Sequence, residues 1–351
     1  MDGYLAVVSP HLPSSLVSQE ALSRIRTVAG ELPPCSLAGL ELRLREDLSN
    51  VDFFVRLPYV HPGLAPALVT HPVWQAVQRL CDAMAGPSGP LHEQVRFLFL
   101  EFDLDAPPPA VPIPGLFLEL ETNRTFSARD LLAIAGSLEL GQPRPCVSQD
   151  LLDRCVMALP SGAKVGHLGL MPARPGKAMR LVLQEMPLAA VAGYLDAIGW
   201  RDPTSRLSAL VADIGALADP EALVDIDVDE TVRPRIGVEF YVRRETDSLP
   251  RWKALFTFLS ERGLASPAKT SALLAWPGFT QENAAEGAPG SAWAGNLALG
   301  DLLLRRMARS LFWRNINHIK LSYQPDQEPE VKVYLGFGHN WFPADGAAGS
   351  E

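Results

Sequence analysis

The sequence predicts an α+β fold: a closed, ten-stranded antiparallel β-barrel made of five helix-strand-strand-helix repeats, with the helices outside. Ten short segments alternate polar and apolar residues at strand period, and they pair into five hairpins with loops rich in Pro, Gly, Asp or Asn. Between the hairpins, apolar residues recur at helical spacing. Because this alternation means that one face of each strand packs on apolar residues, we expect helices on the outer face and polar side chains in the interior.

The clearest hairpin covers residues 223–244. Its first arm places Asp225, Asp227 and Asp229 on one face, and its second arm places Arg235 and Glu239 on one face. The arms of the other four hairpins are residues 40–45 and 51–57, 95–104 and 116–121, 164–171 and 178–185, and 318–324 and 331–337.

The predicted helices fill the intervals between the hairpins. They cover residues 72–84, 128–138 with 149–158, 188–198 with 206–217, 249–262, and 297–313. An open sheet with one solvated face is the alternative, but it would leave exposed edges. A closed ten-stranded barrel is wide enough to hold a ligand, because about eight strands already fill most of their interior with side chains.

Composition indicates one domain over residues 1–342 and a disordered tail at 343–351, with residues 277–295 as the least ordered internal segment. The formal charge of −9 gives no sign of a nucleic-acid surface. No apolar run reaches about 18 residues, and the N-terminus lacks the pattern of a signal peptide. We therefore expect a cytoplasmic protein with neither nucleic-acid nor membrane partners.

Common catalytic and metal-binding motifs are absent from the sequence. It contains no Walker A loop, no G-x-G-x-x-G before a helix, no H-E-x-x-H and no DDxxD. The aspartates from Asp225 to Asp229 begin like a calcium loop, but the sixth and twelfth positions are Glu230 and Ile236 instead of Gly and Glu. We therefore predict no metal site, with Mg²⁺ optional at most.

Many charged residues are predicted to face the interior. The basic ones are Arg43, Arg45, Arg56, Arg180, Arg235, Lys320 and Lys332, and the acidic ones are Glu41, Asp52, Glu101, Asp103, Asp225, Asp227 and Glu239. Clustered Arg and Lys suit a polyanion such as a diphosphate. Aromatic residues on the same face, including Phe54, Phe97, Phe99 and Tyr334, suit a hydrophobic part of a ligand. The alternative is a network of salt bridges that satisfies itself without a ligand.

Several short motifs resemble the aromatic prenyltransferases of the ABBA or PT-barrel class, especially those of the dimethylallyltryptophan synthase type. They are Gly39-Leu40-Glu41-Leu42, Val55-Arg56-Leu57-Pro58, Phe102-Asp103-Leu104 and Lys332-Val333-Tyr334. Other strands depart from the K-x-Y pattern of that family. They read Phe117-Leu118-Glu119, Arg180-Leu181-Val182 and Glu239-Phe240-Tyr241.

The resemblance implies transfer of an allylic prenyl group from a diphosphate to an aromatic, other nucleophilic or peptide acceptor in secondary metabolism. It implies that Glu41 accepts a hydrogen bond or proton from the acceptor and that Tyr334 shields the allylic cation. The residues expected to bind the substrates are Arg56, Arg180, Lys320, Lys332, Glu239 and Asp103. We expect Arg56, Lys320, Lys332 and Tyr334 to share one cavity.

A second hypothesis is a barrel without prenyl transfer that binds a small molecule or peptide in natural-product biosynthesis and has lost the diphosphate site. The acidic residues Glu119 and Glu239, on strands where the family carries Lys, favour this hypothesis. The sequence does not distinguish an enzyme that modifies peptides from one that modifies small molecules, because loops select the acceptor.

Overall fold

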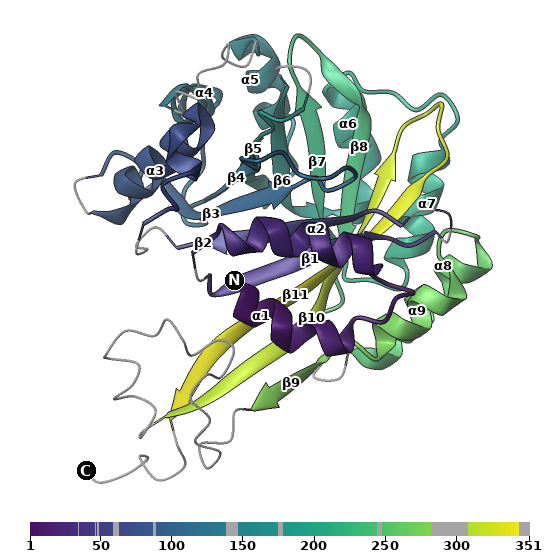
Figure 1. Cartoon of the computed structure of the whole chain (residues 1–351). Helices are drawn as coiled ribbons and strands as arrows, with labels where there is room; N and C mark the ends of the chain where they lie inside the picture. The colour runs from purple at the N-terminus through teal and green to yellow at the C-terminus, as the bar shows by residue number, and fades with distance from the viewer. Residues whose placement is uncertain are drawn as a thin grey trace, which may run out of the picture.

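The computed structural model describes residues 1–33, 35–45, 47, 49–58, 63–86, 89–137, 147–174, 178–243, 248–281 and 308–343. Ten strands close into an antiparallel barrel in the order β1 to β8, β10, β11 and back to β1 (Figure 1). The helices lie outside this barrel, so the predicted fold class is confirmed.

The strands follow the predicted hairpins closely. Their bounds are β1 Leu37–Arg43, β2 Val51–Leu57, β3 Val95–Phe102, β4 Gly115–Leu120, β5 Lys164–Leu170, β6 Met179–Pro187, β7 Glu221–Val228, β8 Val232–Phe240, β10 Ala308–Tyr323 and β11 Glu330–Pro343. The helices are α1 Asp2–Val8, α2 Gln19–Gly30, α3 Pro72–Ala85, α4 Ala128–Ser137, α5 Gln149–Met157, α6 Val191–Ala197, α7 Arg206–Gly215, α8 Leu249–Glu261 and α9 Pro267–Leu274. Short 3₁₀ helices occur at Ser9–His11, Leu68–Thr70 and Leu188–Ala190.

The helix predicted at residues 297–313 is wrong over 308–313, which belong to β10; residues 297–307 lie outside the described part of the chain. The beginning of β10 pairs with β11 on one side and with a short strand, β9 (Gly278–Gln281), on the other. These two partners supply the backbone hydrogen bonds that a helix would have made internally, so tertiary pairing overrides the local pattern. Figure 1 shows the resulting long hairpin, with β9 beside it, extending beyond the barrel.

The two segments predicted to be disordered are mostly outside the described residues. Of residues 277–295, positions 278–281 form β9 and positions 282–295 are not described. The predicted domain border at 342 falls at the end of β11, and residues 344–351 are not described.

Most of the outward face of the barrel is apolar and buried. On β7, the side chains of Val224, Ile226 and Val228 have no exposed surface. Each buried aliphatic side chain of this size contributes about 1.5–3 kcal/mol through the hydrophobic effect. On the opposite side, Trp74 of α3 stacks on Phe102 of β3 with ring centroids 6.3 Å apart. The apolar residues of the alternating pattern therefore pack against the outer helices, and the polar residues point into the barrel interior.

Capping side chains fix where three helices begin. The Ser18 hydroxyl accepts a hydrogen bond from the backbone N–H of Ala21 at the start of α2, and the Ser148 side chain caps α5 in the same way. At α3, His71 Nδ1 accepts from the backbone N–H of Val73. These contacts satisfy N–H groups that a helix cannot satisfy internally. Among the described helices, none is both long and apolar enough to cross a membrane.

Gly39 allows the first strand to pass close to its neighbours, so we expect Gly39→Ala to destabilise the barrel. A Cβ atom there would overlap the Leu335 carbonyl oxygen and the Phe54 ring. Overpacking of this kind costs about 1–3 kcal/mol of unfolding free energy, measured by chemical denaturation. The control is Gly193→Ala in α6, where nothing lies within 4 Å of the added atom. This control should be neutral or stabilising by up to about 1 kcal/mol, and equal effects of the two variants would contradict the prediction.

Candidate functional site

Within the described part of the chain, two neighbouring cavities that share lining residues lie in the barrel interior. One, of about 350 Å³, is lined mainly by charged side chains and is called here the charged compartment. The other, of about 560 Å³, is lined by aromatic, apolar and fewer charged side chains and is called the aromatic compartment. The residues that line both compartments are Glu101, Asp225, Lys320 and Tyr334.

Acidic groups slightly outnumber cations in the charged compartment. The cations are Arg43, Arg174, Arg180, Arg235, Lys320 and Lys332, and the acids are Glu41, Glu101, Asp103, Asp105, Asp225, Asp227 and Glu330. All six of these cations have a carboxylate partner among the described residues. The cations predicted from sequence are therefore present, but each lies against an acid.

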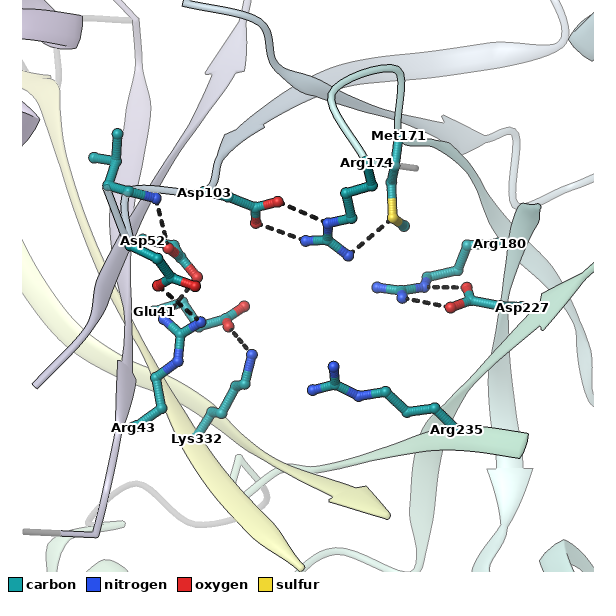
Figure 2. Close-up of polar contacts among 12 residues, drawn as sticks. Glu41, Arg43, Asp52, Asp103, Met171, Arg174, Arg180, Asp227, Arg235 and Lys332 are labelled. Carbon is teal, nitrogen blue, oxygen red and sulfur yellow. Dashed lines mark hydrogen bonds and ion pairs between the residues drawn. The ribbon is translucent and has the colours of Figure 1, made fainter. Parts of the chain in front are cut away.

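Two arginines are held by paired hydrogen bonds, as Figure 2 shows. Arg180 donates from Nε and Nη2 to the two oxygens of Asp227, at 2.7 and 2.9 Å. Arg174 donates to both oxygens of Asp103 in the same manner, at 2.7 and 2.6 Å. Burial opposes the charge of Arg180, but the bonds to Asp227 raise the pKa of its guanidinium above the usual value. Both arginines are consequently fixed in orientation as well as in charge.

The two interior lysines contact carboxylates from other strands. Lys332 of β11 contacts Glu41 of β1, and the hydroxyl of Tyr334 donates to the second oxygen of Glu41. Lys320 of β10 contacts Asp225 of β7. Gly237 of β8 makes room for this second pair, because a Cβ there would lie 2.7 Å from Cε of Lys320.

These contacts fix which form of Glu41 is stable. Burial alone would raise the pKa of the Glu41 carboxyl, but the ammonium groups of Lys332 and Lys320 lower it below its usual value. Burial likewise disfavours the charge on Lys320, whereas the neighbouring carboxylates of Asp225 and Glu239 raise its pKa. Glu41 is therefore an ionised carboxylate already satisfied by two donors, Lys332 and Tyr334.

The aromatic compartment has rings from several strands. The Phe54 ring of β2 lies 5.9 Å from the Tyr334 ring, and the His318 ring stacks on Tyr334 with 4.2 Å between the centroids. Burial, together with the charge of Lys320, lowers the pKa of His318 well below its usual value, so the imidazole is neutral. His318 therefore adds no positive charge to this wall, and the cation near the Tyr334 ring is Lys320, whose ammonium nitrogen lies 6.0 Å from the ring centroid.

Most of the predicted site residues line the two compartments. In the charged compartment these are Glu41, Asp103, Arg180, Lys320, Lys332 and Tyr334, and Glu239 lines the aromatic compartment. Arg56 is not among the lining residues of either; it donates to the Ser36 hydroxyl at 2.9 Å and lies 4.3 Å from the Phe97 ring. Arg45 lies beyond the end of β1 and pairs with Asp47.

The distance of Arg56 from the predicted anion site follows from strand geometry. Asp52 pairs with Arg43 at the charged end, and Phe54 and then Arg56 follow on the same face of β2. Each residue adds about 3.3 Å, so Arg56 lies about 13 Å along the strand from Asp52. The expectation that Arg56 shares a cavity with Lys320, Lys332 and Tyr334 is therefore not met, although those three residues do share one.

Sequence reasoning did not identify Arg174 as an interior residue. It lies beyond the end of β5, so no strand alternation assigns it a face. Only the three-dimensional structure shows that Arg174 lies opposite Asp103, which follows β3, and therefore points into the interior. Among the described residues, no group of three or more His, Cys, Asp or Glu side chains is arranged to hold a metal ion.

No family model matches the chain, and no curated protein matches it. Solved structures do match. A complex of the prenyltransferase PriB with product diphosphate is 17% identical with a TM-score of 0.53, covering 95% of this chain and 96% of PriB. A PriB complex with L-tryptophan and dimethylallyl thiolodiphosphate is 16% identical with a TM-score of 0.51, covering 95% and 94%. The 5-dimethylallyltryptophan synthase from Streptomyces coelicolor is 16% identical with a TM-score of 0.49, covering 95% of each chain.

The first two comparisons extend over nearly the whole barrel, and at this level of identity they bear on architecture alone. They agree with the strand order and the external helices described above. The chain has the PT-barrel fold of the aromatic prenyltransferases.

Proposed function

We propose that this barrel transfers a prenyl group from an allylic diphosphate to an aromatic acceptor. The observation that supports this most directly is the junction of the two compartments, where a cavity rich in cations meets a cavity lined by aromatic rings. A diphosphate needs the first environment, and an allylic cation with its acceptor needs the second. Enclosure within the barrel would also limit reaction of the cation with water.

In this proposal the diphosphate binds among Arg180, Lys320, Lys332 and Arg235. Arg235 is the most accessible of these cations, since its closest carboxylate oxygen, on Glu330, is 3.8 Å away and its side chain is half exposed. Figure 2 shows Arg235 directed toward the space that the other charged groups surround. The remaining cations would exchange carboxylate oxygens for phosphate oxygens as the ligand binds.

The prenyl group would then extend toward Tyr334 and Phe54, whose π faces stabilise a delocalised cation. Glu41 lines the charged compartment beside Tyr334, whose hydroxyl donates to it, and would orient a hydrogen-bond donor of the acceptor at the junction. The PriB structures contain diphosphate, L-tryptophan and dimethylallyl thiolodiphosphate. We therefore choose dimethylallyl diphosphate and L-tryptophan as the first probes. Optional Mg²⁺, a peptide acceptor and a cytoplasmic role in secondary metabolism stay predictions.

A second candidate function is ligand binding without prenyl transfer. It is favoured by the acidic excess of the charged compartment and by the carboxylate partner of each of its six cations. A network that is already neutral gains less from an anionic ligand than an uncompensated cation cluster does. This function predicts that a diphosphate does not bind.

Calorimetric titration with dimethylallyl diphosphate separates the two functions, and mass spectrometry of L-tryptophan incubated with both compounds tests transfer directly. Binding followed by a prenylated product supports the proposal. Absence of binding for dimethylallyl and geranyl diphosphate would favour the second function. If the diphosphate binds but no aromatic acceptor of a panel is prenylated, the chain has a diphosphate site but is not a transferase for these acceptors.

We expect Asp227→Asn to strengthen diphosphate binding by about tenfold, equivalent to about 1.4 kcal/mol. The amide keeps the shape of the side chain but removes the charge that competes with the ligand for Arg180. Isothermal titration with inorganic diphosphate measures the change. The control is Asp213→Asn, because Asp213 pairs with Arg262 at 2.7 Å on the helical exterior. Weaker binding in Asp227→Asn, or an equal change in the control, would contradict an anion site at Arg180.

We expect Lys332→Ala to weaken diphosphate binding and also to lower stability. Breaking a buried ion pair costs about 3–5 kcal/mol because it leaves the other charge, here Glu41, without its counter-charge. The lost contact to phosphate should cost a further factor of about 10 in affinity, since hydrogen bonds to charged groups contribute about 1.5–3 kcal/mol.

The double variant Glu41→Gln with Lys332→Met tells these two effects apart. It removes both charges, so the unfolding free energy should recover while diphosphate binding stays weak. Thermal melting and titration of the single and double variants provide the measurement. A stability loss in Lys332→Ala with unchanged ligand affinity would assign Lys332 a purely structural role.

A further inference from the structure

Glu101 is the interior carboxyl that the ion-pair network leaves free. It is one of the four residues that line both compartments. Of the other three, Lys320 and Asp225 contact each other, and Tyr334 donates to Glu41. Within the described part of the chain, Glu101 makes neither a hydrogen bond nor an ion pair. Its carboxyl group therefore faces the junction with its oxygens available to a ligand.

The surroundings of Glu101 favour the protonated form. Burial, and then the negative charge of Glu41, raise the pKa of the Glu101 carboxyl to about 8, although Lys320, Arg180 and Arg174 oppose this shift. A carboxyl that titrates near the working pH is suited to give and to take a proton. Glu41 is not suited to this, because Lys332 stabilises its ionised form.

Resting on the proposed prenyl transfer, we infer that Glu101 is a catalytic residue that carries a proton between the two compartments. As the allylic C–O bond breaks, its electron pair stays on the departing diphosphate oxygen, and that oxygen takes the proton of Glu101. The allylic carbon then bonds to a ring carbon of the acceptor. The Glu101 carboxylate removes the proton from that ring carbon, and the C–H electron pair restores aromaticity. The proton lost by the acceptor thus restores Glu101, and the diphosphate leaves protonated.

The position of Glu101 meets the geometric needs of both steps. The anion-binding cations lie in the charged compartment, and the rings that would surround the acceptor lie in the aromatic compartment. Glu239 also lines the aromatic compartment, but it already accepts from the Tyr241 hydroxyl at 3.0 Å and has Lys320 at 3.4 Å. Glu101 is the group that reaches both sides without giving up a partner.

The resting proton can be tested without any ligand. The folded pKa of Glu101 lies above its unfolded value, so the folded state holds a proton that the unfolded state has lost; stability should fall as pH rises from about 5 to 8. Glu101→Gln cannot titrate, so this fall in stability should be absent, and the unfolding free energy of the variant should rise relative to that of the wild type as pH increases from about 5 to 8. Asp130→Asn in α4 is the control. Hydrogen bonds from Ser127 lower the folded pKa of Asp130, so its contribution is fully present above its unfolded pKa and should not change over the same range.

The catalytic role is tested by diphosphate release from dimethylallyl diphosphate in wild type and Glu101→Gln. The amide still donates a hydrogen bond but cannot transfer a proton, so release should fall by about 100-fold or more. Affinity for inorganic diphosphate should change much less. The rate of diphosphate release by the wild type should also fall above pH 8, and the rate of the variant should not depend on pH in this range.

The outcomes distinguish this inference from the proposed function. Unchanged release in Glu101→Gln, or a stability difference from the wild type that does not vary with pH, would overturn the proton carrier and leave prenyl transfer in place. A wild type that neither binds diphosphate nor releases it from dimethylallyl diphosphate would remove prenyl transfer itself, and the proton carrier with it.

Discussion

Neutrality of the barrel interior is the constraint on which the rest of this structure depends. Closure of ten strands gives each one an inward face, and the sequence places charges on many of these positions. An uncompensated charge in such a space is costly, so each of the six cations of the charged compartment lies against a carboxylate. Arg180 pairs with Asp227 of the adjacent strand, and Lys332 pairs with Glu41 across the seam where β11 meets β1. These pairs fix the strand register as well as the charge, since a one-residue slip would turn a partner outward.

Neutrality also determines how the site would accept an anion. With Glu101 protonated, the charged compartment contains six cations and six other acidic groups. A diphosphate adds several negative charges to this balanced set. Binding therefore requires that carboxylates such as Asp227 give up their arginine or lysine partners, or that a further acid takes up a proton. Because Glu101 already carries its proton, it adds no negative charge that the incoming diphosphate would have to overcome.

The sequence was sufficient for the barrel because its signal is repeated in every hairpin. Val224, Ile226 and Val228 point outward and Asp225 and Asp227 inward, as the alternation requires. The helix predicted at 297–313 was wrong over 308–313 because apolar spacing there fits either element, and only pairing with β9 and β11 decides between them.

The site was less predictable because alternation gives the face of a residue but not its depth or its partner. Arg56 is about four residues along its strand from the charged end, and no periodicity reveals which end of a barrel a residue occupies. Arg174 lies outside the strands altogether, so its approach to Asp103 depends on how two chain segments meet. Which charged residues pair with each other depends on how the barrel closes in three dimensions, and the pattern of residues along the chain does not contain this information.

The ion-pair partners in the barrel change how one departure from the K-x-Y pattern is interpreted. Glu239 stands on a strand where the resemblance led us to expect a lysine, and this substitution favoured loss of the diphosphate site. In the barrel, however, Lys320 of the adjacent strand is the residue directly opposite Glu239, with 3.4 Å between its ammonium nitrogen and the carboxylate. A cation thus reaches this depth of the interior from the neighbouring strand. Glu239 takes the place of one expected lysine, but Lys320 still supplies positive charge at that location. This substitution alone therefore does not decide against an anion site.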